Sequence, residues 1–410
     1  MPVRSALLIV ALSVSGLVAA EPAPGFKIQL DVVRKGYDGK KCWVHPRAGA
    51  IPPTSAGASP SVVMTLQELL LSGSDIFYAL NEMRTDDFGR TWSGPTEHAD
   101  TLGRRNEPEG VVVAACDFTP KWHAKSGKLL GIGHTVRYQG DKVMAHRKRE
   151  TSYSVYDAER RSWSPWTTLE MPADAKFYNS GAGCVQRVDL ENGDILVPIY
   201  FGERKGRTRV SVIRCTFDGR TLRFVEQGNE LVVDEDRGLH EPSLTRFQGR
   251  FYLTIRQDKS GYVTSSDDGL HFAELRQWQW DDGTNLGNYN TQQHWVRHDD
   301  GLFLVYTRRG ANNDHVFRHR APLFIAQVDP AALRVIRSTE RVLVPERGAR
   351  LGNFGVCEVS ENETWVTVAE WMQTWGPNHI IPPDNKYGAD NSLYTARIRW
   401  QKPNAGWNQN

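Results

Sequence analysis

Two similar runs of residues end in side chains that are suited to proton transfer. His134 follows the run GKLLGIG (127–133), and Tyr200 follows the run GDILVPI (193–199). An imidazole and a phenol can act as base and acid, and an arginine can bind a carboxylate. These groups fit β-elimination from a uronic acid, in which a base removes the proton at C5 and an acid protonates the leaving oxygen at C4. His134 and Tyr200 are therefore candidates for these proton transfers, as near neighbours across adjacent repeats.

A second chemistry is compatible with the carboxylates of the chain. Glycoside hydrolysis usually needs two carboxyl groups, one as acid and one as base or nucleophile. Glu109, Glu241 and Glu370 each lie at the start or the end of a strand-like run, where they could take these roles. The residues alone leave elimination and hydrolysis open.

The elements that must position these groups are short apolar and β-branched runs bounded by Gly, Asn and Asp. Long helical periodicity is nearly absent, so we predict an all-β fold. The runs recur as a unit of about fifty to seventy residues, which is the pattern of a β-propeller with four-stranded blades. The segment FKIQLDVV (26–33) is predicted to supply the outer strand of the last blade and close the ring. We count six blades, which begin near Cys42, Glu109, Asn179, His240, Gln292 and Asn353.

Two segments, RTDDFGRTW (84–92) and TSSDDGLHF (264–272), share one pattern. In each, a hydroxyl, an aspartate and a glycine precede an aromatic residue, which suits a tight turn held by side-chain-to-backbone hydrogen bonds. The pattern resembles the Asp-box of sialidase-like propellers. We expect the boxes between the third and fourth strands of a blade, as scaffold on the face opposite to the predicted site. The assigned residues are Thr85, Asp87, Gly89, Thr91 and Trp92 in the first copy, and Ser265, Asp267, Gly269 and Phe272 in the second.

One face of such a propeller should gather polar side chains. The start of each innermost strand and the end of the second strand open onto the same face around the central channel. Convergent donors, acids and imidazoles in a concave place are typical of a small-molecule or glycan site. The substrate-binding residues predicted on this face are Arg47, Glu109, His240, Glu241, Arg256, Gln293 and Arg308.

Several longer stretches resemble bacterial Asp-box propellers that take part in polysaccharide utilisation. That group contains the ulvan lyases and the L-rhamnose-α-1,4-D-glucuronate lyases, and the resemblance covers nearly the whole chain after the N-terminal apolar run. It implies a polysaccharide lyase, and it also implies seven blades, where we count six. The stretches are CWVHPRAGAIP (42–52), GIGHTVRY (131–138), VPIYF (197–201), NDHVFRHRAPLFIAQVDP (313–330) and VPERGARLGNFGV (344–356).

The ulvan lyases imply one set of catalytic residues. They use a His and a Tyr on adjacent blades as base and acid, which correspond to His134 and Tyr200 here. An arginine after the Tyr neutralises the uronate, and the resemblance offers Arg209 or Arg214 for this role. His146 would be a second imidazole at the same site.

The rhamnose-glucuronate lyases imply a different residue. They depend on a His near the start of the mature chain, and His45 in WVHPRAG is similar to it. Because both sets occur here, either one set is a relic or a binding site, or the protein belongs to a branch with its own substrate.

A sialidase is the alternative class of enzyme, together with other glycoside hydrolases of the rhamnosidase type. Sialidases need three arginines around the substrate carboxylate, an aspartic acid, and a Tyr paired with a Glu. Tyr200 with Glu241 could imitate that pair, but we find no convincing arginine triad or loop aspartate. A non-catalytic propeller that binds glycans is a third class.

The composition and the N-terminal residues indicate which partners and which location to expect. The 410 residues carry a formal net charge of +2, which gives no reason to expect nucleic-acid binding. Residues 1–20 join one Arg to an apolar run that is too short to span a bilayer and that ends in Val-Ala-Ala. We predict a signal peptide cleaved near Ala20, then one propeller domain over 21–410. The protein is expected to be secreted or periplasmic, monomeric, and not inserted in a membrane.

The expected partner is an acidic polysaccharide or oligosaccharide, and the sequence requires no cofactor. A divalent cation such as Ca²⁺ or Zn²⁺ could support the fold or neutralise a carboxylate, and the candidates for a metal site are His315 and His319. The five cysteines show no paired spacing, so most are expected to be buried as small apolar groups.

Overall fold

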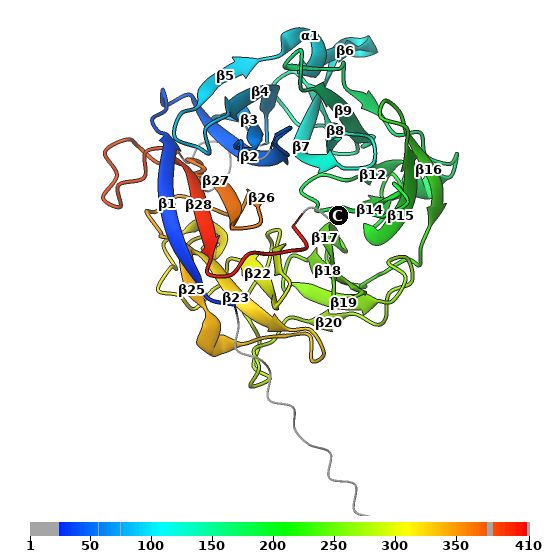
Figure 1. Ribbon diagram of the computed structural model, residues 1–410. Helices are drawn as coiled ribbons and strands as arrows, with labels where there is room; N and C mark the ends of the chain where they lie inside the picture. Colours follow the sequence, from blue (N-terminus) through cyan, green and yellow to red (C-terminus); the bar gives the residue numbers. More distant parts are fainter. Residues whose placement is uncertain (1–23, 56, 74, 375–379, 408–410) are drawn as a thin grey trace, which may run out of the picture.

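Six antiparallel sheets surround a central axis in the computed structural model, which describes residues 24–407 except 56, 74 and 375–379 (Figure 1). Each sheet is one blade of four to six strands, so the fold is an all-β, six-bladed propeller. The predicted blade starts are confirmed to within a few residues, and the ring closes without the seventh blade that the resemblance implied. The predicted signal peptide lies outside the described residues.

The first three blades take up the chain from residue 41 to residue 227. The first blade contains β2 (Lys41–Ile51), β3 (Ser61–Leu70), β4 (Phe77–Thr85) and β5 (Ser93–Glu97). The second contains β6 (Arg105–Glu107), β7 (Val111–His123), β8 (Lys128–Gln139), β9 (Thr151–Asp157), β10 (Ser162–Trp163) and β11 (Thr167–Thr168). The third contains β12 (Asn179–Gly181), β13 (Val188–Asp189), β14 (Ile195–Gly202), β15 (Arg209–Phe217) and β16 (Leu222–Gln227).

The other three blades follow, with few helical turns between the strands. The fourth blade contains β17 (His240–Phe247), β18 (Arg250–Arg256), β19 (Tyr262–Ser266) and β20 (Arg276–Gln277). The fifth contains β21 (His294–His298), β22 (Gly301–Tyr306), β23 (Leu323–Asp329), β24 (Arg334–Val335) and β25 (Arg341–Val344). The sixth contains β26 (Phe354–Ser360), β27 (Glu363–Ala369), β28 (Leu393–Trp400) and β1 (Phe26–Arg34). The helical turns are α1 (Ala99–Leu102), η1 (Pro108–Gly110), η2 (Ala175–Phe177), η3 (Phe317–His319) and η4 (Arg337–Thr339).

The ring is closed by the N-terminal strand, as the sequence predicted. β1 pairs antiparallel with β28, from Phe26 opposite Trp400 to Arg34 opposite Leu393 (Figure 1). Ile28 and Leu30 of β1 pack against the core between the fifth and sixth blades. The pairing covers the free edge of β28, which would otherwise be open to a strand of another chain.

Removal of β1 should therefore weaken the whole propeller. A variant that begins at Lys35 loses the edge pairing and the half-buried apolar side chains of β1, which we expect to cost roughly 3–5 kcal/mol of unfolding free energy. Chemical denaturation followed by circular dichroism would measure this loss, and light scattering would detect association through the exposed edge. A variant that begins at Pro24 is the matched control. Equal stability of the two variants would contradict the role of β1.

The first Asp-box is built as predicted. Thr85 ends β4, and its hydroxyl accepts a hydrogen bond from the Gly89 amide at 2.9 Å, while Asp87 accepts from the Thr91 amide at 2.9 Å and from the Thr91 hydroxyl at 2.6 Å. Trp92 packs between blades, with its ring 6.2 Å from that of Trp365 in the sixth blade. The box therefore stabilises a hairpin and one interface between blades.

The second Asp-box is shifted by one residue from the predicted assignment. Ser266 and Asp268 take the roles that we gave to Ser265 and Asp267: the Ser266 hydroxyl accepts from the Gly269 amide at 2.9 Å, and Asp268 accepts from the His271 amide at 2.7 Å. Asp267 is exposed and pairs with Arg250 instead. The glycine follows the aspartate directly here, so this turn is one residue shorter than the first. Both boxes end a third strand, β4 or β19, as predicted.

Two further findings concern membrane-spanning helices and the cysteines. Within the described part of the chain, no helix has the length and apolar character needed to cross a membrane. Five cysteines, Cys42, Cys116, Cys184, Cys215 and Cys357, are buried as free thiols, in agreement with the expectation that most are small apolar groups.

Candidate active site

The innermost strands bend where they line the channel, and the bends carry the central polar residues. The pairing of β2 shifts between Val44 and Arg47, and the pairing of β7 shifts between Cys116 and Thr119. Bulges of this kind turn a side chain away from its regular direction and are common beside active sites. The residues with positive φ at these bends and at the equivalent places of the next two blades are His45 (55°), Asp117 (52°), Cys184 (59°) and Glu241 (42°). Since such a conformation costs about 1–3 kcal/mol for a residue other than glycine, its repetition indicates a built site.

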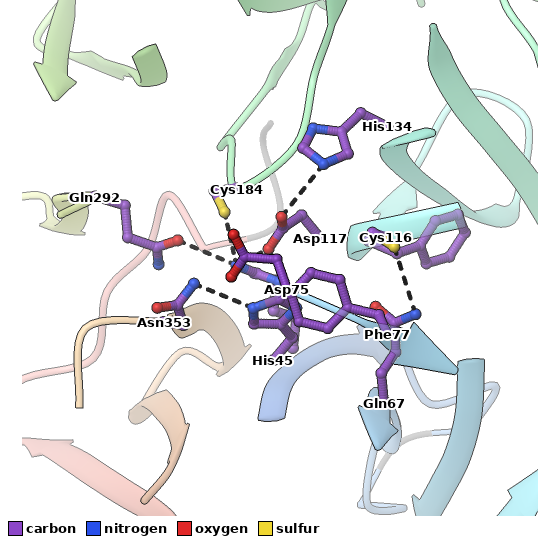
Figure 2. A network of polar contacts seen from close by, with 12 residues as sticks. His45, Gln67, Asp75, Phe77, Cys116, Asp117, His134, Cys184, Gln292 and Asn353 are labelled. Carbon is purple, nitrogen blue, oxygen red and sulfur yellow. Dashed lines mark hydrogen bonds and ion pairs between the residues drawn. The ribbon is translucent and has the colours of Figure 1, made fainter. Parts of the chain in front are cut away.

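Asp117 lies at the centre of this site. One carboxylate oxygen is 3.3 Å from Nδ1 of His45 and 3.1 Å from Nη2 of Arg47, and the other is 3.4 Å from Nε2 of His134. Arg47 also donates to Oε1 of Gln292 and to Sγ of Cys184, each at 3.1 Å. Figure 2 shows these side chains converging from several blades. The two histidines that the sequence offered as alternative sites thus belong to one network.

His134 and Tyr200 are in direct contact, as their equivalent positions in adjacent blades predicted. The Tyr200 oxygen is 2.7 Å from Nδ1 of His134. Close approach requires small neighbours, because a Cβ on Gly183 would lie 2.2 Å from the same nitrogen. Because Nε2 of His134 lies 3.4 Å from the Asp117 carboxylate, we assign the ring hydrogen to Nε2, which leaves Nδ1 to accept a hydrogen bond from the Tyr200 hydroxyl.

Arg149 provides the positive charge beside this pair. Its guanidinium carbon is 4.6 Å from the centre of the Tyr200 ring. Gly181 leaves room for the arginine, because a Cβ there would be 2.8 Å from Cδ of Arg149. Nε and Nη1 of Arg149 are buried and have no hydrogen-bond partner, although buried polar groups are usually paired. These donors are free to bind an anionic group.

The pKa values of the site are shifted mainly by burial. Burial lowers the pKa of His45 to about 4, and burial together with the Arg149 charge lowers the pKa of His134 well below its ordinary value. Burial raises the pKa of Tyr200, while Arg149 acts in the opposite direction. At neutral pH both imidazoles are therefore neutral, and the Tyr200 phenol keeps its proton.

A second group of positive charges lies across the channel, on the fourth to sixth blades. Arg320 and Arg350 are buried, and Nε of each has no hydrogen-bond partner. Burial and the neighbouring charges of Arg256, Arg350 and Arg318 lower the pKa of Arg320 well below its ordinary value. Arg256 is paired with the Glu241 carboxylate at 2.5 Å. The guanidinium groups of Arg256, Arg320 and Arg350 therefore lie together with little negative charge to balance them. The sequence analysis did not identify this arginine group.

Asp75 adds a carboxylate from the loop between β3 and β4. The residue is exposed, and its negative charge acts to raise the pKa of His45, against the larger effect of burial. The same loop is fixed from the second blade, because the Tyr138 hydroxyl donates to the Asp75 carbonyl at 3.1 Å. A loop aspartate at the channel is thus present, which the sequence analysis also missed.

Two predicted carboxylate-binding arginines lie elsewhere. Arg209 is opposite Phe201 in the β14–β15 pair, so it stands on the other face of the sheet from Tyr200, and it pairs with Glu230 at 2.8 Å. Arg214 is far along β15, toward the opposite side of the propeller, where it pairs with Asp194 at 2.8 Å. Arg149 takes the position beside Tyr200 instead.

Other predicted residues divide between the site and its surroundings. His240 lies at the site, with its ring 5.7 Å from that of Tyr200, and Glu241 and Arg256 belong to the second group of charges. Arg47 is fully buried within the Asp117 network. Gln293 is a buried partner of Thr254 in the core, and Arg308 pairs with Glu340 between Trp280 and Phe324. The predicted residues that are exposed and outside the cluster are Glu109 and His146.

Glu370 and the two metal candidates also have other partners. Glu370 is buried and accepts hydrogen bonds from the Asp390 and Ser392 amides, which makes it part of a loop anchor. His315 pairs with Glu346 at 2.7 Å and His319 contacts Tyr289 at 2.6 Å. No group of three or more potential metal-ligating side chains occurs among the described residues.

A separate cavity of about 120 Å³ lies at the other end of the channel. Its walls include Trp122, Trp295 and Trp407, so the C-terminal segment contributes to it. Its charged groups are paired, with Arg297 3.2 Å from Glu358 and Lys121 donating to a backbone carbonyl at 3.0 Å. We place the candidate site at the Tyr200 end, where titratable groups contact one another and guanidinium donors are unpaired.

Of the comparisons with known proteins, the one with solved structures supports the fold. No family model and no curated protein match the sequence. Among solved structures, a protein of unknown function from Dyadobacter fermentans has a TM-score of 0.58 at 13% identity, over 91% of this chain and 99% of that one. Trypanosoma rangeli sialidase in complex with the inhibitor DANA has a TM-score of 0.56 at 15% identity, over 87% of this chain and 55% of that one.

A further structure, the Hadza microbial sialidase Hz136, has a TM-score of 0.58 at 11% identity, over 87% of this chain and 66% of that one. The chain thus spans about half to two thirds of the sialidase chains that it resembles. Together the blades and these neighbours define a six-bladed β-propeller of the sialidase-like fold.

Proposed function

We propose that the protein is a carbohydrate-active enzyme, and more specifically a polysaccharide lyase that cleaves an acidic glycan next to a uronic acid by β-elimination. The observation that carries the proposal is the contact of 2.7 Å between the Tyr200 oxygen and His134 Nδ1, beside the unpaired donors of Arg149. A proton-transfer pair next to a free guanidinium is what elimination at a uronate requires.

The geometry changes the roles that the sequence suggested. Nδ1 of His134 is hydrogen-bonded to Tyr200, and Nε2 lies 3.4 Å from the Asp117 carboxylate, so neither ring nitrogen is open to substrate. The Tyr200 oxygen is therefore the atom that contacts the substrate, and His134 is the acceptor of its proton. This is the arrangement in which a reactive hydroxyl is activated by a base that a third group orients.

The proposed reaction balances without water. As the Tyr200 oxygen takes the proton from C5, its own proton moves to Nδ1 of His134. The electron pair of the broken C5–H bond forms the C4–C5 double bond, and the C4–O bond breaks. The restored phenol gives its proton to the leaving oxygen, and His134 returns its proton to Tyr200. Arg149 stabilises the negative charge that develops on the uronate carboxylate.

The surroundings of the pair support an acidic polymer as substrate. Arg256, Arg320 and Arg350 offer a second place for an anionic group across the channel. A cavity of about 410 Å³ between the second and third blades is lined by Arg149 and Tyr178, and we propose that it holds a neighbouring sugar. We further propose that the enzyme is exported, acts as a monomer and needs no metal for the proton transfers.

Sialidase-type hydrolysis is the second candidate, because the arginine group and Asp75 provide an anion site and a loop carboxylate. The arrangement of tyrosine and glutamate argues against it. Tyr200 is hydrogen-bonded to His134, and Glu241 is held by Arg256, so the two do not form the pair that a sialidase uses.

One assay separates the candidates. The protein is incubated with ulvan, gum arabic and a sialoside, and the ultraviolet absorbance of a 4,5-unsaturated uronate and the release of free sugars are both recorded. We expect absorbance to rise with at least one uronate polymer and no release of sialic acid. Release of sialic acid would favour the second candidate, and sugar release without absorbance would favour another hydrolase.

A further inference from the structure

We propose that Asp117 is the positioning residue of this site and that it joins His45 and His134 into one unit. The role in turnover rests on the proposed elimination. The effect on the histidine tautomers does not depend on it.

The position of Asp117 indicates a special role. It lies in the apolar run VVVAACDF of β7, between the buried residues Cys116 and Phe118, and it is itself buried. An ionised carboxylate is costly to bury unless charged or hydrogen-bonding groups surround it. The bulge turns it out of the regular strand into the channel, where His45, Arg47 and His134 supply such groups.

One hydrogen bond to each imidazole, together with the position of the Asp117 carboxylate, assigns the tautomers. Nδ2 of Asn353 donates to Nε2 of His45 at 3.1 Å, so Nδ1 of His45 carries the hydrogen and faces Asp117 (Figure 2). Nε2 of His134 carries its hydrogen toward the other carboxylate oxygen. One carboxylate thus accepts a hydrogen bond from the Arg47 guanidinium at 3.1 Å and lies within 3.3–3.4 Å of a ring nitrogen of each imidazole. Burial alone would raise the pKa of Asp117, but the attraction of these three groups lowers it well below its ordinary value.

The consequence for His134 is direct. With its hydrogen held at Nε2, Nδ1 is left as an acceptor toward Tyr200. A neutral amide at position 117 could present its nitrogen to His134, which would shift the imidazole hydrogen to Nδ1 and block proton acceptance from Tyr200. Loss of the orienting carboxylate in a comparable triad lowers kcat by about 10⁴ through the wrong tautomer. His45 acts through Asp117 in this account, as a second positioning residue and not as a separate site.

The test combines a spectroscopic and a kinetic measurement. Nitrogen NMR of the histidine side chains in Asp117→Asn should show that His134 loses its Nε2–H form, which the wild-type protein should show. In the His45→Gln variant, His134 should keep its Nε2–H form. Its signal should broaden, because the Asp117 carboxylate is held less firmly without His45. His134→Gln assigns the resonance. None of these measurements needs a substrate.

On any substrate that the wild-type protein cleaves, Asp117→Asn should lower kcat by about 10³- to 10⁴-fold with KM within about threefold. His45→Gln should lower kcat by about 10- to 100-fold, as is typical when an outer partner of an oriented group is lost.

The matched control is Asp189→Asn, which removes another buried carboxylate, paired with Arg187 on the opposite side of the propeller. It should lower stability without changing the His134 tautomer or kcat. An unchanged His134 tautomer in folded Asp117→Asn would overturn the proposal, whatever the substrate. A wild-type protein that shows the expected tautomers but cleaves no uronate would reject the elimination and leave the positioning role supported.

Discussion

The Tyr200→Phe variant is expected to lose about 10³-fold in kcat on a uronate polymer, within the range of about 10²–10⁴ for removal of a proton-transfer group. The variant keeps the aromatic ring that packs against His240 and Arg149, so KM should change little. Only the oxygen that contacts His134 and, in our mechanism, the substrate is removed. Steady-state kinetics from the rise in ultraviolet absorbance would measure both parameters.

Two further variants make this result specific. Tyr252→Phe removes another hydroxyl from a buried tyrosine in β18, outside the site, and should have wild-type kinetics. The kcat of the double variant Tyr200→Phe with His134→Ala should lie within a fewfold of the kcat of Tyr200→Phe alone, because groups that act as a unit have non-additive effects. Additive losses would mean that His134 acts on the substrate independently, as the sequence analysis suggested.

The Arg149→Ala variant should lower kcat/KM by about 10²- to 10³-fold on a uronate polymer, comparable to the loss of one donor that stabilises developing charge. Arg149→Lys should recover only part of the activity, because an ammonium keeps the charge but cannot donate two parallel hydrogen bonds. A methyl-esterified substrate has no carboxylate charge to neutralise, so Arg149→Ala should differ from the wild-type enzyme by less than about tenfold on it.

The esterified polymer therefore acts as its own control for folding. An equal loss of kcat/KM on the charged and the esterified substrate would show that Arg149 has a structural role and does not bind the carboxylate. In that event the arginine group of Arg256, Arg320 and Arg350 would become the place for the carboxylate.

The fold was predictable because each blade repeats the same pattern of strands and turns. The apolar runs marked the second strand of each blade, and consecutive blades placed His134 and Tyr200 at equivalent ends of these strands, so their contact followed from the repeat. The closing strand was predictable for the same reason, since residues 26–33 have the composition of a strand and the sixth blade lacked its outer edge.

The centre of the site was less accessible to sequence analysis. Asp117 lies in the middle of an apolar strand, and only the bulge brings it into the channel. The signal that could have found it is the single carboxylate within VVVAACDF. Arg149 was hidden in the basic loop HRKRE (146–150), which is typical of a solvated segment. Arg209 was misplaced because pairing with Phe201 puts it on the other face of the sheet.

The predicted assignment of the second Asp-box was wrong by one residue for a local reason. Ser265 and Ser266 are adjacent, as are Asp267 and Asp268, so the sequence allows two alignments. The longer alignment matches the first box in spacing, but the shorter turn lets the Ser266 hydroxyl reach the Gly269 amide. Duplicated residues of the same type thus left the choice to hydrogen-bond geometry.

The most direct test of the account is the fate of water in the reaction. A uronate polymer that the protein cleaves is digested in isotopically labelled water, and the products are analysed by mass spectrometry. Elimination predicts an unsaturated uronate at one new end, no labelled oxygen at the other, and product masses that sum to the mass of the substrate. Labelled oxygen at the new reducing end, with product masses that exceed the substrate by one water, would contradict elimination and identify the protein as a hydrolase.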